Sequence, residues 1–161
     1  MAVDMFLKLD GIEGESRDKT HAKSIDVLAW SWGLSQSGSF HAGGGGGAGK
    51  ASFQDISITK YVDKSSMTLM GKIATGSHIA KAKLIVRKAG GTAPIEYIVI
   101  EMEQVMVTSY STGGSGGEDK LTENISLNFA ICKTSYLPQN AEGGAEAAVE
   151  FKWNIPENTT A

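Results

Sequence analysis

Several features that mark other protein classes are scarce in this chain. One cysteine, Cys132, excludes an internal disulfide framework and a zinc site built from several cysteines. Basic residues are not in excess, since 15 Lys and Arg face 18 Asp and Glu, and a net charge of −3 argues against a nucleic-acid partner. No apolar run approaches about 18 residues, and the N-terminus lacks the basic start of a secretory signal. We therefore expect no membrane partner and a cytoplasmic starting location.

Glycine is the residue in excess. The chain has 20 glycines but only 3 prolines in 161 residues, whereas glycine averages roughly 7% in proteins. The composition is otherwise globular, with 41% hydrophobic and 20% charged residues, and the length predicts one domain over 1–161. The longest glycine cluster lies in a connection over 36–51, which is longer than a hairpin needs and is typical of a functional loop.

Alternation of apolar and polar residues predicts a mainly β fold. The clearest strand covers 121–136, where Ile125, Leu127, Phe129 and Ile131 share one face. Similar patterns predict strands over 5–9, 53–60, 81–87, 95–108 and 149–153. With seven to nine strands expected, the spacing favours a sandwich or a closed barrel. The C-terminal region 138–161 is expected to be loose, with a connection over 140–148 before the last strand.

The segment 24–35 predicts a strand with one heavy and one light face. The heavy face, expected in the core, consists of Leu28, Trp30, Trp32 and Leu34. The light face consists of Ala29, Ser31, Gly33 and Ser35. This uncharged face suits a close neighbour or a smooth channel wall, and the change of pattern predicts a bulge near Val27.

One helix is predicted over about 65–75. Ser65 or Ser66 can cap its N-terminus, and Gly76 can end it. The expected buried stripe consists of Met67, Met70, Ile73 and Ala74.

Residues 44–51 nearly match the sequence motif of a phosphate-binding loop but lack two of its features. Gly44, Gly49 and Lys50 have the spacing of G-x-x-x-x-G-K-[ST], but Ala51 replaces the hydroxyl residue that holds magnesium. A strand pattern rather than a helix follows. We expect no nucleotide site and no cofactor, and we interpret the segment as a flexible or partner-ordered loop.

The remaining candidates for chemistry are isolated. The histidines His21, His41 and His78 do not have metal-ligand spacing, so we expect surface or turn positions and no metal. Cys132 alternates with Ile131 in a strand and is expected to be a packed small residue. Glu101 and Glu103 share a strand face and favour a solvated or subunit-contacting surface. No group reaches an enzyme signature, so no catalytic residue is predicted.

Several motifs in order resemble the haemolysin-coregulated protein (Hcp) family of bacterial type VI secretion systems. The strongest is IDVLAWSWG at 25–33 followed by SQSG at 35–38 and the glycine run through Lys50. The others are AVDMFLK at 2–8, GES at 14–16, DKTH at 18–21, TKYVDKS at 59–65, KLIVRKAGG at 83–91 and GGED at 116–119. The resemblance covers about residues 2–136.

The resemblance implies a compact two-sheet β-barrel with one short helix and a long glycine-rich protruding loop. It also implies a structural subunit of the tail tube, assembled as a homohexameric ring whose copies stack. A contractile sheath drives the tube out of the cell behind a spike protein, and the ring lumen carries and chaperones small effector proteins. The chain would be secreted without a cleaved signal peptide, and it would not be an enzyme.

The resemblance and the strand alternation together give candidate site residues. Ala29, Ser31 and Gly33 are expected to face the lumen and the cargo, opposite Trp30 and Trp32. The ring-stacking loop is expected to use Ser39, Phe40, His41, Gly43, Gly44, Gly45, Gly46, Gly47, Gly49 and Lys50.

Two other readings remain open. The chain could be a monomeric β-sandwich that binds a peptide or glycan with its glycine-rich loop. It could also be an enzyme that uses Lys50 on a phosphate or Cys132 as a nucleophile. The oligomeric state separates the ring subunit from the monomeric binding module.

Overall fold

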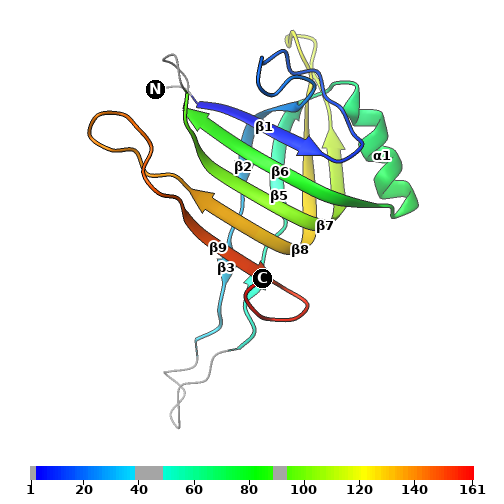
Figure 1. The fold of residues 1–161 in the computed structure, drawn as a ribbon. Coiled ribbons are helices and arrows are strands. Elements are labelled where there is room, and N and C mark those ends of the chain that lie inside the picture. The colour runs from blue at the N-terminus through cyan, green and yellow to red at the C-terminus, as the bar shows by residue number, and fades with distance from the viewer. Residues whose placement is uncertain (1–2, 39–48, 89–93) are drawn as a thin grey trace.

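The structure is a computed structural model and describes residues 3–38, 49–88 and 94–161. The described chain forms nine strands and one helix (Figure 1). In chain order they are β1 (Val3–Leu9), β2 (Ile25–Ser31), β3 (Leu34–Ser35), β4 (Ser52–Phe53), β5 (Ile56–Tyr61), α1 (Ser65–Thr75), β6 (His78–Lys88), β7 (Glu96–Thr112), β8 (Thr122–Tyr136) and β9 (Val149–Asn154).

Six of these strands close into a barrel. Their order is β5, β2, β1, β6, β7 and β8, and β8 pairs back onto β5 to complete the circuit. All the pairings are antiparallel, and β9 extends the sheet beyond β8. Closure leaves few strand edges exposed to solvent. The expected mainly β barrel with a single helix is confirmed.

The barrel is flattened into two layers because β7 and β8 each take part in both. Residues 122–127 of β8 pair with β5, whereas residues 131–136 pair with β9. In Figure 1, β1, β6, β7, β8 and β9 run together across the front, and β2 and β5 run behind them. We call these layers the front sheet and the back sheet.

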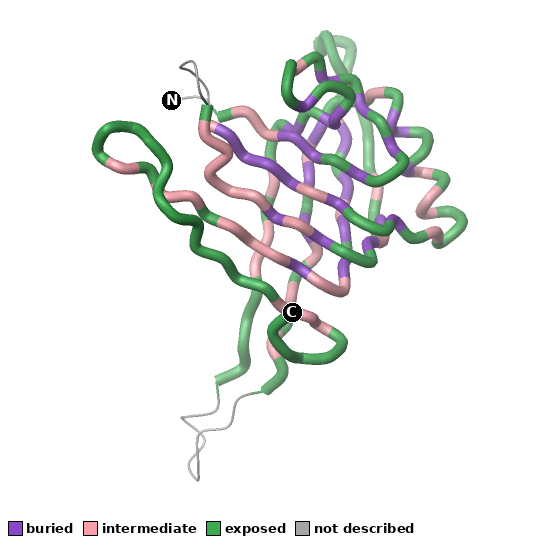
Figure 2. Tube along the Cα trace, in the orientation of Figure 1, coloured by how far each residue is buried: buried purple, intermediate pink, exposed green. Residues whose placement is uncertain are grey.

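The core fills the space between the layers. In Figure 2 the buried positions gather where the two layers face each other, and the exposed positions mark the loops and β9. Leu7, Leu84, Ile100 and Leu127 are among the fully buried side chains, and Trp30 and Trp32 pack against this cluster. The heavy face of the segment 24–35 is therefore confirmed at its two tryptophans.

The two leucines of the heavy face, Leu28 and Leu34, are exposed rather than buried in the core. The predicted bulge is present, because the pairing of β2 with β5 shifts between Val27 and Ala29. Leu28 lies at this bulge and is 39% exposed, and Leu34 is 51% exposed. Leu34 belongs to β3, which pairs with β4 in a two-stranded arm that projects from the barrel (Figure 1). The expected strand over 53–60 is likewise divided between β4 and β5.

Helix α1 has the expected bounds but a different buried face. Its first turn is held by Asp63, whose Oδ1 accepts the backbone N–H of Ser65 at 2.9 Å, and Gly76 ends it with a left-handed φ of 67°. Met67 is 66% exposed, so the predicted stripe is wrong there. The face toward the barrel carries Ser65, Leu69 and Ile73, which recur at every fourth residue.

Candidate assembly surfaces

The outward side of the back sheet is covered by small uncharged side chains. Two adjacent cross-strand rows on β2, β5, β8 and β7 form it, and we call it the hydroxyl face. One row consists of Ser31, Ser57, Ser126 and Ser109, and the other of Ala29, Thr59, Asn124 and Ser111. Six of these eight residues carry hydroxyl groups, and none carries a charge.

The hydroxyl face is tied together by side-chain hydrogen bonds. The Oγ atoms of Ser109 and Ser126 lie 2.5 Å apart, and Thr59 Oγ1 donates to Asn124 Oδ1 at 2.6 Å. At one margin Asp55 accepts hydrogen bonds from Thr108 Oγ1 at 2.7 Å and from Asn128 Nδ2 at 2.9 Å. The face therefore presents many hydroxyl groups, and its only formal charge among the described residues is that of Asp55 at this margin.

Two of the three predicted lumen residues lie on this face. Ala29 and Ser31 are exposed there, on the side of β2 opposite Trp30. Gly33 does not share the face, because the chain leaves β2 after Ser31 and Gly33 O accepts the backbone N–H of Gln54 at 2.9 Å. An added Cβ at Gly33 would lie 3.2 Å from the Gln54 amide oxygen, so the two segments pass close together at this point.

The arm formed by β3 and β4 carries the predicted stacking loop. Residues 39–47 of that prediction (Ser39, Phe40, His41 and Gly43 to Gly47) lie outside the described residues. Gly49 and Lys50 are described on the loop side of β4, at the end of the arm away from the barrel, and both are exposed. An added Cβ at Gly49 would lie 2.6 Å from Ser37 Oγ across the arm, so the Ser37 hydroxyl would have to rotate away from a larger residue.

An apolar overhang lies where β8 and β9 run past the barrel. Tyr136 pairs with Val149 and Thr134 with Phe151, on the same side as the half-buried Trp153. Tyr136 and Phe151 are exposed, and Val149 is 63% exposed. Apolar side chains therefore continue along this side of the sheet from the core into solvent. Such an exposed apolar patch is typical of a surface that another chain covers.

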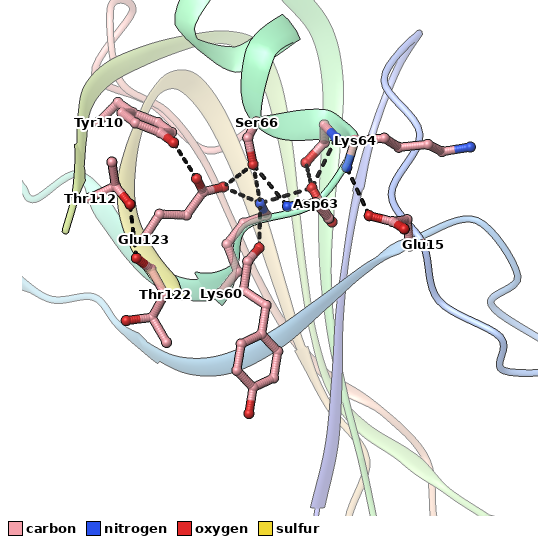
Figure 3. A network of polar contacts seen from close by, with 11 residues as sticks. Glu15, Lys60, Asp63, Lys64, Ser66, Tyr110, Thr112, Thr122 and Glu123 are labelled. Atoms are coloured by element: carbon pink, nitrogen blue, oxygen red, sulfur yellow. Dashed lines mark hydrogen bonds and ion pairs between the residues drawn. The ribbon is translucent and has the colours of Figure 1, made fainter. Parts of the chain in front are cut away.

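A buried polar network ties α1 to the barrel (Figure 3). Lys60 and Glu123 form an ion pair, and both side chains are 0% exposed. Lys60 Nζ also donates to Asp63 Oδ1 and to the Tyr61 carbonyl, each at 3.0 Å. Glu123 accepts hydrogen bonds from Ser66 Oγ at 2.8 Å and from the Tyr110 hydroxyl. Both charged groups thus have satisfied hydrogen bonds, which a buried pair requires.

Sequence reasoning missed this network, although a signal for it exists. Lys60 occupies the inward register of Ile56 and Ile58, and Glu123 occupies that of Ile125. Opposite charges at inward positions of two neighbouring strands indicate a buried pair. The same surroundings raise the pKa of Tyr110, first through burial and then through its hydrogen bond to Glu123.

A second cluster holds the loop 10–24 over the outer side of β1 and β6. Arg87 donates to Asp18 Oδ2 at 2.6 Å and to Asp4 Oδ2 at 3.0 Å. The guanidinium holds the pKa of Asp18 well below its usual range. His21 is buried rather than at the surface, because its ring packs on Phe6 and its Nε2 lies 2.5 Å from Glu96 Oε1. His21 does begin a turn, since its carbonyl accepts the backbone N–H of Ser24 at 3.2 Å, so of the two expected positions, surface or turn, only the surface one is wrong here.

The isolated candidates for chemistry stay apart in the structure. Cys132 is fully buried, and burial raises the pKa of its thiol, which disfavours a nucleophile. Glu101 lies between Lys83 and Lys133 on the exposed side of the front sheet, and Glu103 is exposed beside it. In the described part of the chain, no three His, Cys, Asp or Glu side chains are grouped to hold a metal ion. None of its helices is long and apolar enough to cross a membrane.

Comparison with known proteins agrees with this architecture. Residues 6–136 match the family described as type VI secretion system effector, Hcp. Protein hcp1 of Pseudomonas aeruginosa is 57% identical over 162 residues, covering all of both chains. A solved Hcp1 from Salmonella typhimurium is 34% identical with a TM-score of 0.82, over all of both chains. A type VI secretion system effector from Yersinia pestis is 32% identical with a TM-score of 0.77, over 94% of this chain and 100% of that one. The chain belongs to the Hcp family of type VI secretion proteins.

Proposed function

We propose that this protein is the structural subunit of a type VI secretion tail tube. Six copies form a ring, rings stack into a tube, and small effector proteins travel in the lumen. The observation that carries the proposal is the hydroxyl face, a four-stranded surface without a formal charge along its two rows. A channel wall of this kind can hold diverse cargo through hydroxyl groups without binding one sign of charge strongly.

The strand edges support closure into a ring. In the back sheet the outer edge of β2 has no strand partner among the described residues beyond Asp26, and the edge of β7 has none beyond Met106. Unpaired edges invite pairing with another chain. A ring uses heterologous contacts, in which one surface of a copy meets a different surface of the next. Two unlike edges flanking one face suit that geometry.

The apolar overhang supports the same assembly. Val149 and Phe151 on β9 and Tyr136 on β8 would lose water contact if a neighbouring copy covered them. We assign the stacking contact between rings to the arm of β3 and β4, with its loop at 36–51, because this arm projects from the barrel (Figure 1).

The remaining partners follow from the tube. The spike protein caps it, and contractile sheath proteins surround it and expel it. The subunit assembles in the bacterial cytoplasm and then leaves the cell as part of the expelled tube. The family is one of structural secretion proteins, so the subunit acts by assembly and carriage rather than by catalysis.

The first test is the native mass of the purified protein, by native mass spectrometry. A particle of six 17.0 kDa chains supports the ring. A monomer at all concentrations would rule out the ring and favour a monomeric binding module that uses the glycine-rich loop.

The second test concerns the lumen assignment. Ser31→Gln places a longer side chain on the hydroxyl face and should reduce retention of an effector co-expressed from the same secretion system. Ser115→Gln, in the exposed turn between β7 and β8, is the matched control. Both variants should remain hexameric. Equal retention by the two hexamers would contradict the assignment.

A further inference from the structure

One cross-strand row of the front sheet carries four lysines and one glutamate. Lys8 on β1 lies opposite Lys83 on β6, which lies opposite Glu101 on β7. Glu101 lies opposite Lys133 on β8, which in turn lies opposite Lys152 on β9. We call these five residues the lysine row. Its charge of +3 contrasts with the chain's net charge of −3.

The lysine row breaks a rule of sheet stability twice. Like charges directly opposite each other on neighbouring strands destabilise a sheet, and both Lys8 with Lys83 and Lys133 with Lys152 are such pairs. Glu101 lies 3.5 Å from Lys83 and 3.8 Å from Lys133, and Glu150 on β9 lies 3.5 Å from Lys133. These two carboxylates relieve the inner lysines but not the outer ones. Within the described residues, Lys8 and Lys152 form no ion pair. Rules of this kind are broken mainly where function requires it.

The row is accessible and slightly hollowed. Its residues are exposed or half-buried, and a depression of about 280 Å³ lies at the β1 end of the row. Lys8, Lys83 and Glu101 of the row line this depression together with Asp10, Lys81 and Glu103. The front sheet turns this side away from the hydroxyl face, since the two lie on opposite outer sides of the barrel. The row would therefore remain free when the hydroxyl face and the strand edges are occupied.

We propose that the lysine row binds a segment of a partner protein with an acidic, basic, acidic charge pattern. A carboxylate placed over each lysine pair removes the repulsion, and a cation or donor placed over Glu101 completes the match. The two pair centres are three strand spacings apart, about 14 Å for strands roughly 4.8 Å apart. A nucleic acid is disfavoured because its evenly spaced phosphates would meet Glu101 in the middle of the row.

The test uses the full-length chain and a synthetic helical peptide with two pairs of glutamates about 14 Å apart and a lysine between them. In the row variant, Lys8, Lys83, Lys133 and Lys152 are changed to Gln. In the control variant, Lys19, Lys23, Lys72 and Lys120, which lie on loops and α1, are changed to Gln, so the net charge changes equally. At low salt the row variant should bind the peptide about tenfold more weakly than the unmodified chain, and the control within about twofold of it.

Three results would overturn the proposal. They are equal weakening in both variants, no saturable binding by the unmodified chain, and tighter binding of heparin than of the peptide. A separate measurement tests the repulsion itself. The double variant Lys8→Gln, Lys152→Gln should unfold at a higher temperature than the unmodified chain at low salt, with the difference lost near 1 M salt, where the Debye length is about 3 Å. A lower unfolding temperature would refute the argument from like charges.

Discussion

Replacing Lys60 with methionine should be among the most damaging single changes in the barrel. Both Lys60 and Glu123 are 0% exposed, so the substitution leaves a carboxylate buried without its cation. Breaking a buried pair in this way costs about 3–5 kcal/mol. A chain of this size is stable by about 5–15 kcal/mol. The variant should therefore fold, with a large part of its stability lost.

Urea denaturation followed by tryptophan fluorescence measures this loss. With a slope of about 2 kcal/mol per molar, the midpoint should fall by about 1.5–2.5 M. Lys60→Met combined with Glu123→Gln removes both charges while an amide keeps contact with Ser66 and Tyr110, and it should recover at least half of the loss. All chains are compared at one protein concentration because assembly adds to stability. A single variant that loses under about 1 kcal/mol, or a double variant that merely adds two losses, would refute the reasoning.

Three further predictions test other parts of the molecule. Phe151→Glu on the apolar overhang should shift the native mass from a hexamer toward a monomer, whereas Lys152→Glu on the opposite side of β9 should leave the hexamer intact. Gln104, whose φ is 54°, should tolerate Gly, while Gln104→Val should lower the free energy of unfolding by about 1–2 kcal/mol in urea titrations. Asp18→Asn should destabilise the fold at pH 7. Because the folded-state pKa of Asp18 is depressed, the advantage of the native residue is complete above its ordinary pKa of 3.8 and should shrink in titrations at lower pH.

The sequence predicts most of the strands because their alternation matches what the barrel requires. In β8, Ile125, Leu127 and Phe129 are buried as their spacing predicts, and the bulge after Val27 follows from a break in the same rule. Family motifs then narrow the choice between sandwich and barrel. Local patterns predict these features because alternation within a strand depends only on which side of that strand faces the core.

Local sequence patterns do not predict features that form only when segments distant in the sequence come together. The buried side of α1 is set by the barrel end that covers it, so exposed Met67 and buried Ser66 contradict a reading based on hydrophobicity alone. Lys60 and Glu123 are 63 residues apart, and their burial becomes favourable only once β5 and β8 are paired. The lysine row is invisible along the chain because its members come from five strands.

The way β7 and β8 change layers explains how one small barrel offers unlike outer surfaces. In β7, Ile100 and Met102 point into the core, as do Val105 and Val107, so the inward register shifts by one residue between Met102 and Val105. Gln104, with its left-handed φ, lies within that shift. Before it, outward positions of β7 join the front sheet and carry Glu101 of the lysine row. After it, outward positions join the back sheet and carry Ser109 of the hydroxyl face. The twist at Gln104 therefore lets the same two strands present charged side chains on one side of the barrel and uncharged hydroxyls on the other, an arrangement that suits the proposed tube wall.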